Sequence, residues 1–185
     1  MHKYILLDVD GTLIDSSPGL YKSFIKASNF LGLENVDENY FKKNIGPPID
    51  IIFTNIFDLD KKTKEKFIKY FRKDYDNKGY LGYKSKTNIE ILKKIISNNI
   101  KLGIVTNKPT LPTINILKDM KALDFFADII CKDTYNTSFT KRENLKKIIN
   151  NLKDSNSIKK SEIIYIGDTL EDLDAATYNN IAFAA

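Results

Sequence analysis

The chain has 185 residues, a length that allows one domain or one domain with an inserted module. Hydrophobic residues make up 42% of it, which is enough apolar material for a packed core and excludes wholesale disorder. The net charge of +5 comes almost entirely from lysines spread along expected helical faces. We therefore expect no nucleic-acid partner.

Two further absences narrow the class of protein. The single histidine, His2, excludes a Ser-His-Asp triad and a histidine-rich zinc site. No apolar run approaches the roughly 20 residues needed to cross a bilayer, and Asp8 interrupts the first apolar run before it is long enough for a secretory signal. We expect a cytoplasmic protein with no membrane partner.

The first strand is expected at 3–8, where a mostly apolar run ends in Asp8-Val9-Asp10-Gly11-Thr12. Apolar residues from 16 to 83 then keep helical spacing, with Ser17 as the first N-cap and Pro18 at the first helical position. This pattern predicts an all-helical module at 16–83, inserted into a core made of 1–15 and 84–185.

The rest of the chain alternates between strands and helices. Strands are expected at 100–106, 127–131 and 163–167, and helices at 87–97, 111–120, 141–152 and 170–178. Thr87 and Glu90 form a plausible capping box for the first of these helices. Short apolar strands between helices predict an α/β fold with a doubly wound parallel sheet. Another strand begins within 181–185.

Polar residues stand at the ends of the expected strands. Asp8 and Asp10 follow the first strand, Thr106 and Asn107 follow a later one, and an acidic cluster from Asp168 to Asp172 follows another. Lys141 begins a later helix. Since open α/β sheets bind ligands outside the carboxyl ends of their strands, we expect these side chains to converge at one edge.

This set of motifs resembles the haloacid dehalogenase superfamily, and within it the phosphatases that carry a helical cap after the first motif. The resemblance covers essentially the whole chain. The four motifs match at Asp8-Val9-Asp10-Gly11-Thr12, Thr106-Asn107, Lys141, and Gly167-Asp168 through Asp172. The sequence departs from the usual pattern in two places: Thr140-Lys141-Arg142 replaces Gly-Lys-Pro, and relatives usually continue with a further strand and helix.

The resemblance implies a Mg²⁺-dependent phosphatase. A carboxylate attacks a phosphoryl group readily once a metal offsets the repulsion between the two anions. Asp8 would be the nucleophile and form an aspartyl-phosphate, and Asp10 would protonate the leaving oxygen and later activate water. The implied metal ligands are Asp8, the Asp10 carbonyl and Asp168, with Asp172 as a ligand or just behind them. The implied phosphate-binding residues are Thr12, Thr106, Asn107 and Lys141.

The expected substrate is a small phosphomonoester resembling phosphoglycolate, a nucleotide or pyrophosphate. Asn44, Gly46 and Pro47, in a turn of the helical module, are candidate specificity residues. A sugar-phosphate mutase resembling β-phosphoglucomutase stays open as an alternative. A phospho-acceptor receiver and a retired enzyme that binds nucleic acid are more distant ones. The sequence does not decide between a monomer and a homodimer.

Overall fold

The computed structural model describes residues 2–46, 49–135, 139–156 and 158–185. The chain forms two compact units, one made of residues 1–15 and 85–185 and the other of residues 16–84. Two short strands, β2 (Ile14–Asp15) and β3 (Lys84–Ser85), form a two-stranded sheet where the chain leaves the first unit and returns to it.

A five-stranded sheet, in the order β5-β4-β1-β6-β7, forms the centre of the first unit. Every pairing in it is parallel, and β1 pairs with both β4 and β6. The strands are β1 (Tyr4–Leu7), β4 (Lys101–Val105), β5 (Phe126–Ile130), β6 (Ile163–Ile166) and β7 (Ala182–Ala184). The strand order reverses at β1, and this is the position where open α/β sheets bind ligands.

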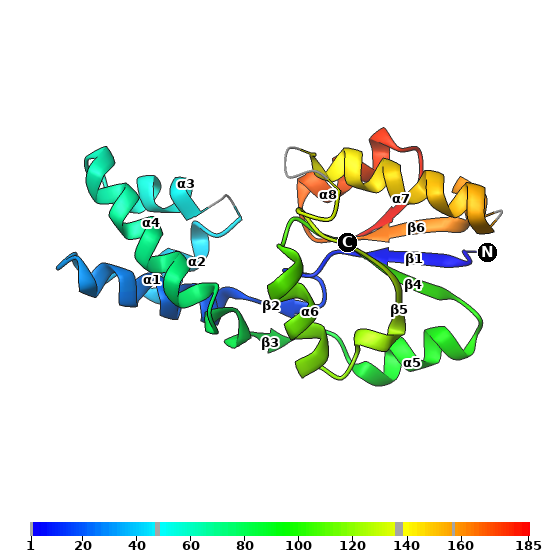
Figure 1. The fold of residues 1–185 in the computed structure, drawn as a ribbon, viewed down its shortest axis with the longest axis horizontal. Helices are drawn as coiled ribbons and strands as arrows, with labels where there is room; N and C mark the ends of the chain where they lie inside the picture. The colour runs from blue at the N-terminus through cyan, green and yellow to red at the C-terminus, as the bar shows by residue number, and fades with distance from the viewer. Residues whose placement is uncertain (1, 47–48, 136–138, 157) are drawn as a thin grey trace. The chain divides into compact units, whose positions relative to one another are not determined.

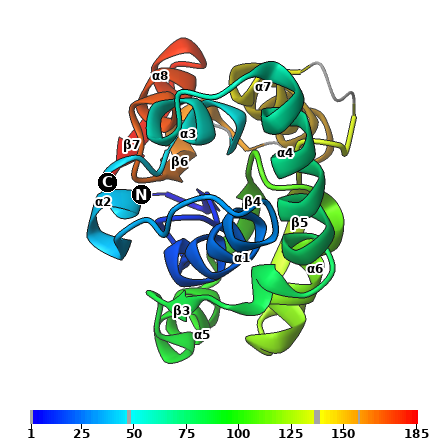
Figure 2. The same ribbon diagram turned by 90° about the vertical axis from the view of Figure 1, so that its left-hand side faces the viewer.

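Helices cover both faces of this sheet, which confirms the predicted doubly wound α/β fold. Figures 1 and 2 show two helices on one face, α7 (Lys141–Asn156) and α8 (Leu170–Tyr178). On the other face lie α5 (Ile89–Ser97) and α6 (Thr110–Asp119). Two 3₁₀ helices, η2 (Leu123–Phe125) and η3 (Lys160–Glu162), precede β5 and β6.

A hydrophobic core lies between the sheet and the helices α7 and α8. Alternate residues of β1, Tyr4 and Leu6, have no exposed surface and belong to this core. The helices contribute apolar side chains that include Leu145, Ile148 and Ala175. Both faces of a central parallel strand are covered, so its sequence reads as one apolar run rather than an alternating one.

Two predicted helix caps are displaced by one residue. Helix α5 begins at Ile89, and its cap is Asn88, whose side chain accepts a hydrogen bond from the Glu90 amide at 2.9 Å. Thr87 instead donates its hydroxyl to the Thr12 carbonyl at 3.3 Å, so a tertiary contact replaces the predicted cap. The first helix has Ser16, not Ser17, at its N-cap position.

The second unit is built of helices around an aromatic core. Its elements are α1 (Ser17–Phe30), α2 (Glu38–Lys43), α3 (Ile49–Ile56), α4 (Lys61–Tyr75) and the 3₁₀ helix η1 (Gly79–Leu81). The Phe24 ring lies 4.8 Å from the rings of both Phe41 and Phe67, and Phe53 lies 4.6 Å from Phe67. These rings pack helices that are individually too short to be stable in water. Within the described residues, no helix is long and apolar enough to span a bilayer.

The buried position of Leu6 gives a stability prediction. We expect Leu6→Ala to lower the free energy of unfolding by about 2–5 kcal/mol, because it leaves a cavity in the middle of the core. Leu170→Ala is the matched control, since Leu170 is 84% exposed and should cost less than about 0.5 kcal/mol. Urea unfolding followed by circular dichroism measures both values, and equal losses would contradict this description of the core.

Candidate active site

Three strand ends deliver polar residues to one edge of the sheet. Asp8 follows β1 directly, and its amide continues the ladder by donating to the Ile166 carbonyl at 2.9 Å. Thr106 follows β4 in the same way, and its amide donates to the Ile130 carbonyl at 2.9 Å. Asp168 lies two residues beyond the end of β6. The parallel pairing of β1 with β4 and β6 therefore sets the spacing of these three residues.

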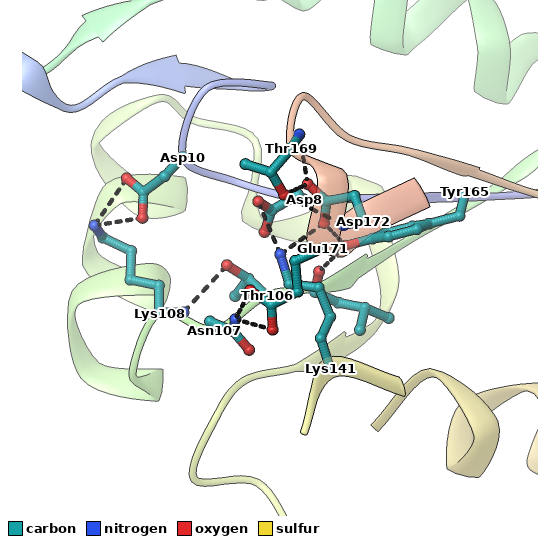
Figure 3. A network of polar contacts seen from close by, with 11 residues as sticks. Asp8, Asp10, Thr106, Asn107, Lys108, Lys141, Tyr165, Thr169, Glu171 and Asp172 are labelled. Atoms are coloured by element: carbon teal, nitrogen blue, oxygen red, sulfur yellow. Dashed lines mark hydrogen bonds and ion pairs between the residues drawn. The ribbon is translucent and has the colours of Figure 1, made fainter. Parts of the chain in front are cut away.

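A buried cluster of charges joins this edge to α7 and α8. The Lys141 ammonium lies 2.6 Å from Asp172 Oδ1 and 3.3 Å from Asp8 Oδ2, and all three side chains are almost completely buried (Figure 3). A buried charge that loses its partner is strongly destabilising. Asp8, Lys141 and Asp172 therefore depend on one another for their positions.

Asp172 is held from several sides. Its Oδ1 also accepts a hydrogen bond from the Tyr165 hydroxyl at 2.8 Å, and Tyr165 belongs to β6. Its Oδ2 accepts from the amide and the hydroxyl of Thr169, at 3.0 and 2.5 Å. Both carboxylate oxygens are thus already occupied by donors, including the ammonium of Lys141.

The electrostatics of the cluster shift three pKa values. Burial raises the pKa of Asp8 to about 6, and the positive charge of Lys141 offsets this only in part. Burial opposes the charged form of Lys141, but the charges of Asp8 and Asp172 raise its pKa above the ordinary value. Burial also acts against the charge on Asp172, yet Lys141 and the other donors hold the pKa of Asp172 below its usual range.

The same residues can hold a hard divalent cation. Asp8, Asp168 and Asp172 each offer a carboxylate oxygen, and these oxygens all lie within 4.8 Å of one another. Oδ1 of Asp8 is buried and has no hydrogen-bond partner among the described residues, so it is available as a ligand. An all-oxygen donor set of this kind fits Mg²⁺. Because donors already occupy Asp172, the contacts favour Asp8 and Asp168 as ligands.

Gly11 makes room for Asp168. Its φ of +80° lies in the left-handed region, and a Cβ built there would collide with the Asp168 carboxylate. The backbone at Gly11 is therefore in close contact with Asp168, a residue from the other end of the chain. This explains why a glycine is needed between Asp10 and Thr12.

The predicted phosphate-binding residues have different surroundings. The Thr106 side chain is buried, and its hydroxyl accepts a hydrogen bond from the Lys108 amide at 3.2 Å. The Thr12 hydroxyl oxygen is buried and has no hydrogen-bond partner in the described part of the chain. Asn107 instead donates to both carboxylate oxygens of Glu171, at 3.0 and 2.9 Å. Asn107 would have to leave Glu171 to contact a ligand.

Asp10 lies apart from the buried cluster and contacts a lysine that sequence reasoning missed. The Lys108 ammonium lies 3.0 Å from each of its carboxylate oxygens (Figure 3). Tyr165 was missed as well, and Glu171 was noted only as a member of the acidic cluster, with no role of its own. The position of Lys108, directly after Thr106-Asn107, was the available signal, whereas Tyr165 is part of an apolar strand and gives none.

The candidate specificity residues lie in the helical unit. Asn44 follows α2, and its side-chain amide donates to the Tyr40 carbonyl at 3.0 Å. Gly46 has a φ of +134°, and Pro47 lies outside the described residues. A role for these residues in substrate choice stays a prediction.

Comparison with known proteins identifies the class to which this fold and site belong. The family model described as haloacid dehalogenase-like hydrolase matches residues 5–185. The match runs through all four motifs, and the chain therefore belongs to this family of hydrolases.

The individual relatives share only 26–29% sequence identity with this chain. A phosphoglycolate phosphatase from Vibrio vulnificus is 27% identical over 183 residues, which cover 94% of this chain and 78% of the relative. A 5′-nucleotidase from Pseudomonas aeruginosa is 26% identical and matches 96% of this chain and 79% of its own length. A solved structure, described as a predicted phosphatase from Clostridium acetobutylicum, is 29% identical with a TM-score of 0.77, over 99% of this chain and 83% of its own.

The close approach of Gly11 to Asp168 generates a prediction for cation binding. We expect Gly11→Ala to weaken Mg²⁺ binding about tenfold or more, because the new methyl group pushes the Asp168 carboxylate out of place. Isothermal titration calorimetry measures this affinity.

Gly32→Ala is the matched control. Gly32 also has a left-handed φ, +66°, but its Cβ would meet no atom within 4 Å. Both variants should lose a similar free energy of unfolding, about 1–2 kcal/mol, because each places alanine at a left-handed φ. Their stabilities should therefore be similar, whereas their Mg²⁺ affinities should differ. Unchanged Mg²⁺ affinity in Gly11→Ala would remove Asp168 from the cation site.

Proposed function

We propose that the protein is a Mg²⁺-dependent phosphatase that hydrolyses a small phosphomonoester through an aspartyl-phosphate. The observation that carries this proposal is the buried carboxylate of Asp8. One of its oxygens lies 3.3 Å from the Lys141 ammonium, and the other is buried without a hydrogen-bond partner among the described residues. The names of the phosphoglycolate phosphatase and 5′-nucleotidase relatives support the same reaction class.

In the first step, a carboxylate oxygen of Asp8 attacks the phosphorus atom and forms a P–O bond. The P–O bond to the leaving group breaks, and Asp10 donates a proton to the departing oxygen. Bound Mg²⁺, held by Asp8, the Asp10 carbonyl and Asp168, would supply the positive charge that lets two anions approach. Asp172 would act indirectly, by holding the Lys141 ammonium in position.

In the second step, a water molecule attacks the phosphorus of the aspartyl-phosphate. Asp10 accepts a proton from this water, and the bond between phosphorus and the Asp8 oxygen breaks. Inorganic phosphate leaves, Asp8 is a free carboxylate again, and Asp10 releases its proton to solvent when it returns to Lys108. Lys141 and Thr106, with Thr12 and Asn107, would bind the phosphoryl oxygens as their charge redistributes.

This scheme requires Asp10 to move. In the structure, its carboxylate is bound to the Lys108 ammonium and not directed toward the buried cluster (Figure 3). Its side chain is 38% exposed, so it is free to rotate without opening the core. The proposal therefore includes a turn of Asp10 from Lys108 toward the oxygen of the leaving group, and the uptake of one proton from solvent by its carboxylate before it acts as the acid.

The covalent step gives a direct prediction. We expect Asp8→Asn to lower kcat by at least about a thousandfold, because the amide is a far weaker nucleophile than the carboxylate. Phosphate release is measured with Mg²⁺ and in EDTA, over phosphoglycolate, pyrophosphate, nucleoside monophosphates and sugar phosphates. The circular dichroism spectrum should not change.

Glu143→Gln is a matched control for the loss of one carboxylate, because Glu143 is an exposed residue in the first turn of α7. It should keep wild-type turnover. Unchanged activity in Asp8→Asn would remove the covalent mechanism. A wild-type protein that interconverts sugar phosphates and releases little phosphate would favour the mutase instead.

The raised pKa of Asp8, about 6, predicts how Mg²⁺ binding depends on pH. The cation binds the ionised carboxylate, so acid competes with it. Affinity should be steady above about pH 7 and fall by up to about tenfold per pH unit below about pH 6. Calorimetric titration at several pH values tests this. Asp8→Asn should bind more weakly and lose this dependence, and a pH-independent affinity in the wild type would contradict it.

A further inference from the structure

Tyr165 is a core residue with a polar end. It lies in β6, has no exposed surface, and packs with the apolar side chains between the sheet and the helices α7 and α8. A phenylalanine would fill nearly the same space without burying a hydroxyl, and a buried hydroxyl is costly unless it forms hydrogen bonds. The contacts of this hydroxyl therefore decide what Tyr165 adds beyond packing.

The hydroxyl of Tyr165 joins two elements at the edge of the sheet. Its oxygen lies 2.9 Å from the Val105 carbonyl oxygen and 2.8 Å from Asp172 Oδ1 (Figure 3). Val105 is the last residue of β4, directly before Thr106, and Asp172 belongs to α8. Because β1 lies between β4 and β6 in the sheet, the Tyr165 side chain reaches across the central strand to contact β4. One side chain thus spans the part of the sheet that carries the nucleophile.

The hydroxyl has one hydrogen for these two acceptors. A carbonyl oxygen and an ionised carboxylate can only accept, so Tyr165 donates to one of them at a time or shares its hydrogen between them. The Asp172 carboxylate lies against the Lys141 ammonium, and hydrogen bonds to charged acceptors are roughly twice as strong as neutral ones. Asp172 is therefore the main acceptor.

The two oxygens of Asp172 are fixed by different parts of the chain. Oδ2 accepts from the amide and the hydroxyl of Thr169, the N-cap residue of the same helix. Oδ1 accepts from the Lys141 ammonium and from Tyr165, and of these two donors only Tyr165 is attached to the sheet. A lysine side chain is flexible, whereas a tyrosine ring in a packed core is not. Tyr165 therefore fixes Oδ1 relative to the sheet.

The position of Oδ1 determines the position of the Lys141 ammonium. The ammonium lies 2.6 Å from Asp172 Oδ1 but 3.3 Å from Asp8 Oδ2, so Asp172 is its closer partner. If Oδ1 shifts, the ammonium shifts with it and changes its distance to Asp8. A displacement of about 1 Å in a group of this kind can lower a reaction rate about a hundredfold.

We infer that Tyr165 is a positioning residue of the active site. Its hydroxyl holds Asp172 Oδ1, and Asp172 in turn holds the Lys141 ammonium at a set distance from the nucleophile. Tyr165 itself touches neither the substrate nor the reacting atoms. The expected effect on turnover rests on the proposed function, whereas the expected effect on the ammonium rests on the contacts alone.

The substitution Tyr165→Phe removes the hydroxyl and keeps the ring. We expect it to lower kcat for phosphate release about tenfold with a smaller change in KM, because a displaced ammonium chiefly affects the charge that develops in the transition state. Steady-state kinetics with Mg²⁺, at a temperature where the variant is fully folded, measures both constants. A loss of packing alone would lower the stability and leave kcat unchanged.

Tyr4→Phe is the matched control. Tyr4 also has no exposed surface, packs in the same core, and donates its hydroxyl to a carboxylate, that of Asp128 in β5. Tyr4 begins β1, whereas Asp8 follows the other end of this strand. Tyr4→Phe should therefore keep the wild-type kcat. Unchanged kcat in Tyr165→Phe, or equal losses in the two variants, would overturn the inference.

Nuclear magnetic resonance of the lysine ammonium groups tests the position of Lys141 without turnover. In the wild type, Lys141 should give a slowly exchanging ammonium signal with a nuclear Overhauser cross peak to the Tyr165 hydroxyl proton, because both groups lie against the same oxygen. This cross peak decides the question even if Tyr165→Phe does not fold. Tyr165→Phe should shift the ammonium signal, and Tyr4→Phe should leave it in place.

The magnetic resonance result separates this inference from the proposed function. A missing cross peak in the wild type, or an unshifted Lys141 signal in Tyr165→Phe, overturns the inference even if the protein is an active phosphatase. The expected cross peak and shift in a protein that hydrolyses no phosphate ester support the positioning role of Tyr165 and reject the phosphatase.

Discussion

The ion pairs of the Lys141 ammonium with Asp8 and Asp172 are the interaction on which the site depends. They connect the end of the central strand β1 with the helices α7 and α8, and they do so where almost no water can reach. Each charge would be too costly to bury alone, so the folded chain tolerates these residues only together. The arrangement leaves one oxygen of Asp8 buried and unpartnered among the described residues, and the proposed mechanism depends on this carboxylate.

The parallel sheet explains how residues distant in sequence reach this cluster. Strand β1 pairs on one side with β4, which leads to Thr106, and on the other with β6, which leads to Asp168. The strand order reverses at β1, so the helices that follow β4 and β6 lie on opposite faces of the sheet. Gly11 completes the arrangement, because only a residue without a side chain allows Asp168 to lie so close to the first motif.

Much of this could be predicted from the sequence. The strands and helices of the α/β unit were predicted to within a few residues, because buried parallel strands are short apolar runs bounded by polar residues. The acids at 8, 168 and 172 could be identified from their positions after strands. Local sequence patterns failed where a tertiary contact determines the position of a side chain. The Thr87 hydroxyl donates to the Thr12 carbonyl, and Asn88 caps α5 in its place. We expected Asp10 to converge with the other strand-end side chains, but its charged contact is Lys108. Tyr165 looks like any core residue until its hydroxyl is seen against Asp172.

The chain order of the central sheet has a consequence for synthesis on the ribosome. Strand β1 is made first, yet its two neighbours come from residues 101–105 and 163–166, and Lys141 and Asp172 are made later still than β4. Until those segments emerge, the nascent chain exposes an unpaired apolar strand that ends in an acid with no counter-charge. Long-range parallel pairing of this kind is slow to form. The aromatic unit at 16–84 is contiguous in sequence, so it can fold first. The α/β unit cannot complete its sheet until β6 and the residues after it have been synthesised.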